Sequence, residues 1–218
     1  RPEPGGAGRG QMGVMRGLDG IRHIIEEEAG KGRRDRDHQE QLHLCFGLPG
    51  VGFYDRDYFA QMLFAIALGG GTSSRLFHEV REERGLAYSV SASASPYADG
   101  GLVTIYAACD PERAHEAVPV ILQETRTLGD TLTDEELARA KALVRAGLLM
   151  EMESTSSRAE RLANHLLIHN RLIPLEETLQ SLAAVQRDDI RRFSARLLAG
   201  PLSRAAVGPL ARLEPFAA

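Results

Sequence analysis

The sequence has few lysines, few cysteines and no long hydrophobic segment, and each absence removes a class of function. Lys31 and Lys141 are the only lysines, although the chain carries 26 basic and 30 acidic side chains and a net charge of -4. This near balance argues against a nucleic-acid-binding protein, because such proteins display a strongly basic surface. We interpret the preference for arginine as a sign of GC-rich coding and a bacterial origin.

The two cysteines, Cys45 and Cys109, lie in apolar strand-like runs, so we expect free buried thiols and no disulfide framework. No stretch approaches the roughly 18 apolar residues of a membrane span, and no secretory signal is visible. These absences predict a bacterial cytoplasmic protein, with the periplasm or the mitochondrial matrix as alternatives. The chain begins at Arg1, which is typical of a fragment or a processed product.

The 218 residues suffice for a domain with a buried core. Residues 1–38 are rich in proline, glycine and arginine, and we predict a flexible leader or linker there. Residues 39–218 are predicted to form the folded domain. Period-two patterns predict strands over 42–48, 87–95, 101–109 and 205–208. Helical spacing predicts helices over 55–68, 72–85, 111–128, 133–170, 175–183 and 188–198. This order predicts an α+β fold, a mainly antiparallel sheet packed with helices.

Two histidine motifs resemble parts of zinc sites. His165 and His169 stand four positions apart on one helix face, a spacing that can ligate zinc. However, the residues between them include no glutamate, so the general base of a zinc peptidase is missing. His23 opens an H-x-x-E-H pattern, but Glu27 occupies the position of its second histidine. We therefore expect neither a metal site nor a catalytic residue in this chain, and a zinc enzyme built on His165 and His169 is the alternative.

Arg81 and Tyr88 form the sharpest candidate pair. Arg81 lies near the end of a predicted helix and Tyr88 at the start of the next strand, and the turn between them can bring both to one edge. Guanidinium and phenol both donate hydrogen bonds, so together they could bind a peptide carbonyl oxygen and the charge it gains during acyl attack. The alternative is that Arg81 pairs with a carboxylate of its own helix and Tyr88 packs in the core.

The glycine run Gly69-Gly70-Gly71 precedes that helix. A phosphate-binding loop would require a lysine, and a dinucleotide fingerprint would require a preceding strand, where a helix is predicted instead. We therefore predict that the glycines allow a tight turn and a close approach to another chain.

The block from Gly69 to Val90 resembles the zinc metallopeptidases of the pitrilysin, insulinase and mitochondrial-processing-peptidase type, also called inverzincins. It resembles the domain of these enzymes that does not hold zinc. Further matching motifs, in the family's order, are Gln41-x-His43, Asp55-x-Asp57-Tyr58, Tyr97-x-Asp99-x-Gly101, Glu135-Glu136-Leu137-x-Arg139-Ala140-Lys141, Glu153-Ser154-Thr155-Ser156-Ser157-Arg158 and Asp188-Asp189-Ile190.

The resemblance implies a role for the candidate residues. In the family, an N-terminal domain holds zinc through H-x-x-E-H and a downstream glutamate, and a second domain of similar fold closes over the cleft. An Arg/Tyr pair of the second domain reaches the substrate backbone, and Arg81 and Tyr88 match that pair. The run Gly69–Gly71 matches, in shortened form, the glycine-rich loop of the processing peptidases, which faces the substrate cavity.

The sequence lacks H-x-x-E-H, so the chain alone is predicted not to hydrolyse peptides. The predicted function is that of the substrate-contacting C-terminal domain of a zinc metalloendopeptidase that cleaves unfolded peptides or presequences. Zinc would be held by a partner, either an N-terminal domain or a homologous subunit. The alternative is a non-catalytic scaffold or assembly subunit of the same family.

Overall fold

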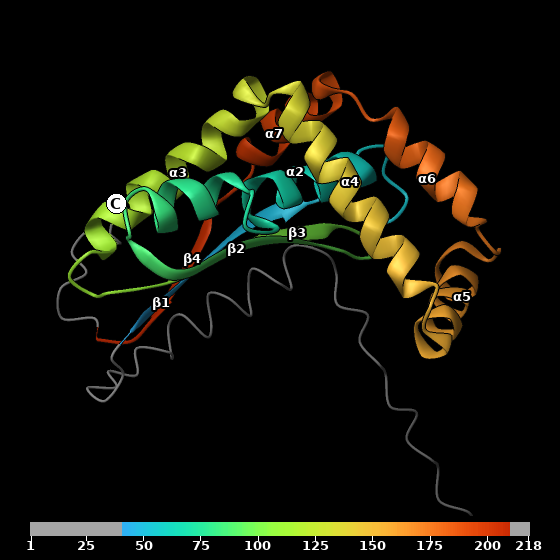
Figure 1. Ribbon diagram of the computed structural model, residues 1–218, viewed down its shortest axis with the longest axis horizontal. Helices are drawn as coiled ribbons and strands as arrows, with labels where there is room; N and C mark the ends of the chain where they lie inside the picture. The colour runs from blue at the N-terminus through green and yellow to red at the C-terminus, as the bar shows by residue number, and fades with distance from the viewer. Residues whose placement is uncertain (1–40, 210–218) are drawn as a thin grey trace, which may run out of the picture.

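The computed structural model describes residues 41–209 and contains one sheet with helices packed on it (Figure 1). The strands are β1 (Leu42–Gly50), β2 (Ala87–Pro96), β3 (Gly101–Cys109) and β4 (Ser203–Val207), in the order β2-β3-β1-β4. Every neighbouring pair is antiparallel. The helices are α2 (Tyr58–Gly69), η1 (Phe77–Glu82), α3 (Ala114–Thr131), α4 (Asp134–Glu151), α5 (Thr155–His169), α6 (Leu175–Ala184) and α7 (Arg187–Leu198). This architecture confirms the predicted α+β class.

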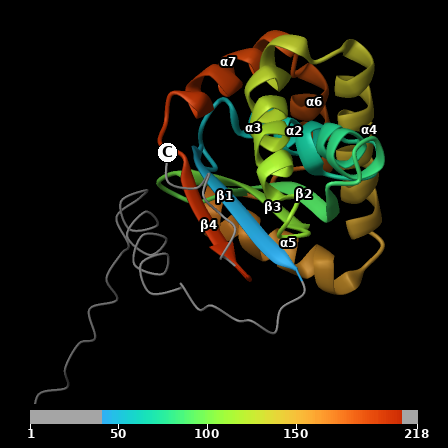
Figure 2. The same ribbon diagram turned by 90° about the vertical axis from the view of Figure 1, so that its left-hand side faces the viewer.

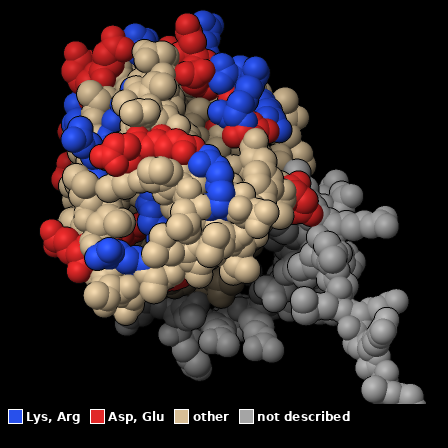
Figure 3. All heavy atoms as spheres, turned by 90° about the vertical axis from the view of Figure 1, so that its right-hand side faces the viewer, with Lys and Arg blue, Asp and Glu red and all other residues tan. Residues whose placement is uncertain are grey.

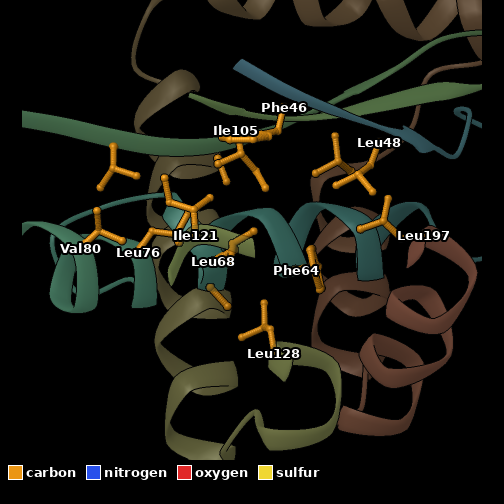
Figure 4. Close-up of a cluster of buried hydrophobic side chains, with 14 of the residues drawn as sticks. Phe46, Leu48, Phe64, Leu68, Leu76, Val80, Ile105, Ile121, Leu128 and Leu197 are labelled. Atoms are coloured by element: carbon orange, nitrogen blue, oxygen red, sulfur yellow. The ribbon is translucent and has the colours of Figure 1, made fainter. Parts of the chain in front are cut away.

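The core lies between one face of the sheet and the helices above it. Alternate residues of β1, from Leu42 to Leu48, turn toward α2, α3 and α7, and each is at most 4% exposed. Figure 4 shows Phe46 and Ile105 of the sheet above Phe64 of α2. Figure 2 shows the two layers end-on, with β1 and β4 at the near side of the sheet. A strand that is apolar on one face only requires this one-sided cover.

The start of α2 is tied to α7 by ion pairs. The helix was predicted from residue 55 and begins at Tyr58, with Asp57 as its N-cap residue. Asp57 is 1% exposed, and its Oδ1 accepts hydrogen bonds from Arg192 Nε at 3.1 Å and Nη2 at 2.5 Å. Asp55 accepts from Arg196 Nη1 at 2.7 Å. A buried carboxylate requires such partners.

The single helix predicted over 133–170 is wrong, because the structure divides it into α4 and α5. The break falls at Met152-Glu153-Ser154, where Ser154 adopts an extended conformation and its side chain accepts the Ser157 N–H. Serine is a favoured N-cap because it supplies an acceptor to a helix start. Helix α5 then lies at the lower right of Figure 1, beside the ends of α4 and α6. The predicted leader, residues 1–38, lies outside the described residues, so its boundary stays a prediction.

Candidate functional site

Arg81 lies in a six-residue π-helix, η1, that follows the glycine run. The π register is visible in the Glu83 N–H, which donates to the His78 carbonyl at 2.9 Å. Such segments insert an extra residue into a helical turn and occur frequently at functional sites. Gly85 then ends the helix with a left-handed φ of +57°, a conformation that glycine adopts without strain.

The Arg81 side chain is exposed and makes no ion pair with any residue between 41 and 209. Its guanidinium carbon lies 4.9 Å from the centre of the Phe77 ring, a cation–π contact that holds the stem on the helix surface. The nearby carboxylate of Glu79 is bound by Arg84 instead, and that hydrogen bond holds the pKa of Glu79 below its usual range. The alternative in which Arg81 pairs with its own helix face is therefore not observed.

Tyr88 occupies an irregularity at the start of β2. Ala87 pairs with Cys109 and Ser89 with Ala108, so Tyr88 is the extra residue of a β-bulge. A bulge redirects a side chain, and bulges are over-represented next to active sites. The Tyr88 side chain is 59% exposed, so it does not pack in the core as the alternative required. Both residues of the candidate pair therefore lie at backbone irregularities and face outward.

Strand β2 lies at one edge of the sheet. Among the described residues it pairs only with β3, which leaves its outer edge open. Its side chains beyond the bulge alternate, with Ser91 and Ser93 exposed and Ala92 buried. Helix η1 packs against this strand, so Arg81 and Tyr88 belong to neighbouring elements, and Tyr88 lies on the edge strand itself. An edge of this kind can accept an extended peptide by backbone pairing.

Arg75 anchors this region, and the sequence analysis gave it no role. Its guanidinium donates to both carboxylate oxygens of Glu136, at 2.7 and 2.9 Å, and to the Thr131 carbonyl at 2.8 Å. Burial alone would raise the pKa of Glu136, but the hydrogen bonds from Arg75 and from the Thr133 N–H outweigh it and lower the pKa. Thr133 and Glu136 form the capping box of α4, whose start coincides with that of the helix predicted from residue 133. Arg75 thus fixes the turn before η1 to the start of α4.

The three glycines have different surroundings. A Cβ on Gly69 would lie 2.3 Å from the Ala92 backbone nitrogen, so Gly69 permits the close packing of α2 on β2 within this chain. A Cβ on Gly70 would meet the Ile66 Cα at 2.6 Å. Gly71 is exposed, and its nearest neighbour would be Leu143 Cδ2 at 3.7 Å. Only Gly71 is therefore open to an approaching chain.

His165 and His169 lie side by side on α5, with ring centres 6.3 Å apart. The His165 Nδ1 accepts the Ile173 N–H at 3.2 Å, which leaves one ring nitrogen for another partner. Over residues 41–209, no cluster of three or more potential metal ligands is present. The H-x-x-E-H-like motif at His23 lies outside the described residues. In the same range, no helix combines the length and hydropathy needed to cross a bilayer.

The fold and the site define a helix-covered antiparallel domain with an exposed arginine and an exposed tyrosine on neighbouring elements, one of them the edge strand β2. The family described as "Peptidase M16 inactive domain" matches residues 22–144, more than half of the chain. The chain therefore belongs to the M16 peptidase inactive-domain family. This membership confirms the resemblance to metallopeptidases of the pitrilysin and processing-peptidase type.

Bacterial relatives support the same assignment. An "uncharacterized zinc protease" of Streptomyces coelicolor is 36% identical over 172 residues, which cover 78% of this chain and 38% of the relative. A protein of the same description from Mycobacterium tuberculosis is 38% identical, covering 78% of this chain and 39% of the relative. The "uncharacterized zinc protease YmxG" of Bacillus subtilis is 32% identical, and the match covers 78% of this chain and 42% of the relative. The chain thus spans about two fifths of the curated relatives that it matches.

Solved structures show the same fold. A chain of complex III2 from Candida albicans has a TM-score of 0.73 at 19% identity, covering 82% of this chain and 45% of that one. A Helicobacter pylori protease has a TM-score of 0.69 at 21% identity, and the match covers 80% of this chain and 42% of that one. A peptidase M16 inactive domain from Pseudomonas fluorescens has a TM-score of 0.69 at 24% identity, and the match covers 81% of this chain and 43% of that one.

Proposed function

We propose that this chain is the substrate-contacting half of a zinc-dependent metalloendopeptidase that acts on unfolded peptides or presequences. The observation that carries the proposal is the placement of Arg81 and Tyr88. Both are exposed, each lies at a backbone irregularity, and the elements that carry them, η1 and the edge strand β2, pack against each other. Irregular backbone supported by a packed core is a frequent feature of functional sites.

The chemistry of the pair suits a peptide carbonyl. In the proposed complex, the substrate lies extended along β2, where its backbone adds to the sheet. The Tyr88 hydroxyl and the Arg81 guanidinium donate hydrogen bonds to the scissile carbonyl oxygen, which becomes more negative as water attacks. The exposed Gly71 leaves room for the substrate backbone beside α2. The chain's own residues therefore position and polarise the substrate, while the attacking water is activated elsewhere.

Zinc and the general base are assigned to a second domain or a homologous subunit. Two observations support this division: the sequence contains no H-x-x-E-H, and relatives named zinc proteases are more than twice as long as the matched region. In the proposed enzyme, that second domain or subunit would supply the metal that activates water for hydrolysis.

The exposed leucines of helix α5 support the proposal that the chain binds a partner. Leu162, Leu166 and Leu167 of this helix are 47, 52 and 83% exposed. Figure 3 looks onto the side of the molecule that carries α5 and α6, and it shows broad uncharged surface in its lower half. Exposed apolar patches on soluble domains commonly mark interfaces. We assign this surface to the zinc-bearing half.

The same surface is compatible with the second candidate, a scaffold or assembly subunit. Its support is the fold shared with a chain of complex III2. A scaffold requires a stable partner but no contribution from Arg81 or Tyr88 to catalysis.

Reconstitution distinguishes these functions. Hydrolysis of an unfolded peptide is measured with zinc for this chain alone, for the zinc-bearing half alone and for their mixture. The proposal predicts activity only in the mixture. A stable but inactive complex would favour the scaffold. Chelator-sensitive activity from this chain alone would overturn the proposal and direct attention to His165 and His169.

A further inference from the structure

A second site lies between α2, α4, α5 and α6, and neither Arg81 nor Tyr88 lines it. The cavity there has a volume of about 600 Å³. Its apolar wall is formed by Phe53, Phe59 and Met62 on one side and by Ile168 and Ile173 on the other. Cavities of about 300–1,000 Å³ with mostly apolar walls and a few polar groups are typical of small-ligand sites.

The main polar group in this cavity is Arg161 of α5, whose side chain is only 14% exposed. Its Nη2 donates one hydrogen bond, to Thr178 Oγ1 at 3.1 Å. The nearest carboxylate oxygen, Glu151 Oε2, lies 4.0 Å from Nη1, beyond hydrogen-bond distance. A guanidinium carries five N–H donors, so most of the donors of Arg161 have no partner within residues 41–209. Burying unpaired donors is costly unless a ligand or water binds them.

Two further donors line the same cavity. Tyr58 contributes a hydroxyl that has no hydrogen-bond partner in the described part of the chain, and burial raises its pKa, so it stays protonated. His165 accepts the Ile173 N–H through Nδ1, which places the proton of the neutral ring on Nε2. Burial, followed by the charge of Arg161, lowers the pKa of His165 and keeps the ring neutral.

Three glutamates also line the cavity, but each is exposed to solvent or bound by an arginine. The Glu151 side chain is 56% exposed at the end of α4. Glu177 is bound by Arg171, whose Nη1 donates to it at 2.9 Å. Glu160 is exposed. Repulsion from exposed carboxylates is screened by water and salt, whereas interactions of a shielded guanidinium are screened less.

We propose that this cavity binds a carboxylate attached to an apolar body, such as the apolar C-terminal residue of a peptide. The carboxylate accepts hydrogen bonds from Arg161, and the planar guanidinium fits a carboxylate in a two-point arrangement. Tyr58 and His165 supply additional donors, and the apolar part of the ligand packs between Phe59 and Ile168. This proposal does not depend on peptidase activity.

The test compares one ligand with its uncharged counterpart. Binding of N-acetyl-phenylalanine and of N-acetyl-phenylalanine amide to the full chain is measured by isothermal titration calorimetry. The acid should bind more than about tenfold more tightly than the amide, because charge-assisted hydrogen bonds are roughly twice as strong as neutral ones. Equal affinity of acid and amide, or no binding of either, would overturn the proposal. Octanoate identifies the source: affinity equal to that of the acid indicates a fatty acid, and weaker binding indicates a peptide end.

Matched variants locate the site. Arg161→Gln should remove the preference for the acid, whereas Arg158→Gln, one turn earlier on α5 and exposed, should retain it. If Arg161→Gln loses its fold, Tyr58→Phe serves instead, since it removes only the hydroxyl and should weaken binding of the acid several-fold. The ligand would lie elsewhere if only Arg158→Gln lost the preference for the acid over the amide. The same conclusion would follow if Arg161→Gln and Tyr58→Phe both bound the acid with full affinity.

Discussion

The body of the domain buries its apolar side chains, whereas helix α5 of the same chain leaves most of its own exposed. In the body, Phe64 and Phe193 meet edge to face with ring centres 5.6 Å apart, and both are fully buried. Helix α5 buries none of its 15 residues, and Leu167 is 83% exposed. Since helices gain most of their stability from packing an apolar face, the contrast supports the proposal that the exposed leucines of α5 form the partner surface.

The candidate pair lies on the body of the domain. Arg81 and Tyr88 are exposed, but the elements that carry them rest on buried residues such as Val80 and Val90, which are 0 and 8% exposed. A rigid support of this kind lets an exposed side chain hold its position without a partner. The two regions therefore differ: Arg81 and Tyr88 are carried by elements with buried support, whereas α5 leaves its leucines exposed.

The largest effect is expected where the body buries a charge. Arg192→Ala removes the principal partner of Asp57 and should lower the free energy of unfolding by about 3–5 kcal/mol, since it leaves a buried carboxylate poorly compensated. Arg191→Ala is the matched control, because its ion pair with Asp130 is 69 and 67% exposed and is worth about 1 kcal/mol or less. Urea unfolding measures both. Equal losses would show that the buried pair does not stabilise the body.

A smaller effect is expected at the anchor of η1. Arg75→Ala should cost about 2 kcal/mol, because Arg75 and Glu136 are only 15 and 17% exposed. The pKa of Glu136 is lowered in the fold, so its contribution is complete above the ordinary carboxyl pKa of about 4 and is lost as the pH falls through the lower folded value. The wild-type chain should therefore lose stability in acid more steeply than Arg75→Ala. A variant at exposed Arg145 should follow the wild-type profile, and identical profiles for all three would contradict this assignment.

The smallest effect on folding is expected on α5. Leu166→Ser should change the free energy of unfolding of the isolated chain by about 0.5 kcal/mol or less, because the side chain is already 52% exposed. The same change should weaken binding of the zinc-bearing half at least about tenfold if this face is the interface, as a loss of about 1.4 kcal/mol implies. Unchanged affinity in a titration of the two halves would remove α5 from the interface.

The sequence predicted most elements of the body because their patterns are local. Alternation in 42–48 and 101–109 marked strands that are apolar on one face, and helical spacing from residue 133 marked the start of α4. The bulge at Tyr88 escaped the period-two interpretation. Ala87 and Val90 are both buried although they stand three positions apart, and that spacing is the signal that could have revealed it.

Other features depend on contacts that no local pattern records. The π-helix requires an i to i+5 register that leaves no distinct period in six residues. The cavity at Arg161 exists only because α5 folds back toward Tyr58, more than a hundred positions earlier in the chain. Arg81 and Tyr88 were selected by a family resemblance, since spacing alone left a structural role open. Their outward placement became visible only in the fold.

The most direct test of the central claim is the kcat/KM of the reconstituted peptidase with changes at the candidate pair. Tyr88→Phe and Arg81→Ala should each lower kcat/KM about a hundredfold or more, the usual effect of removing one donor to a developing oxyanion, with no change in assembly. Tyr97→Phe is the control, since Tyr97 lies at the loop between β2 and β3 and is also exposed, at 45%. Its kcat/KM should equal the wild-type value. If Tyr88→Phe and Arg81→Ala stay within about twofold of the wild type, the pair does not act on the reacting carbonyl and the account is wrong.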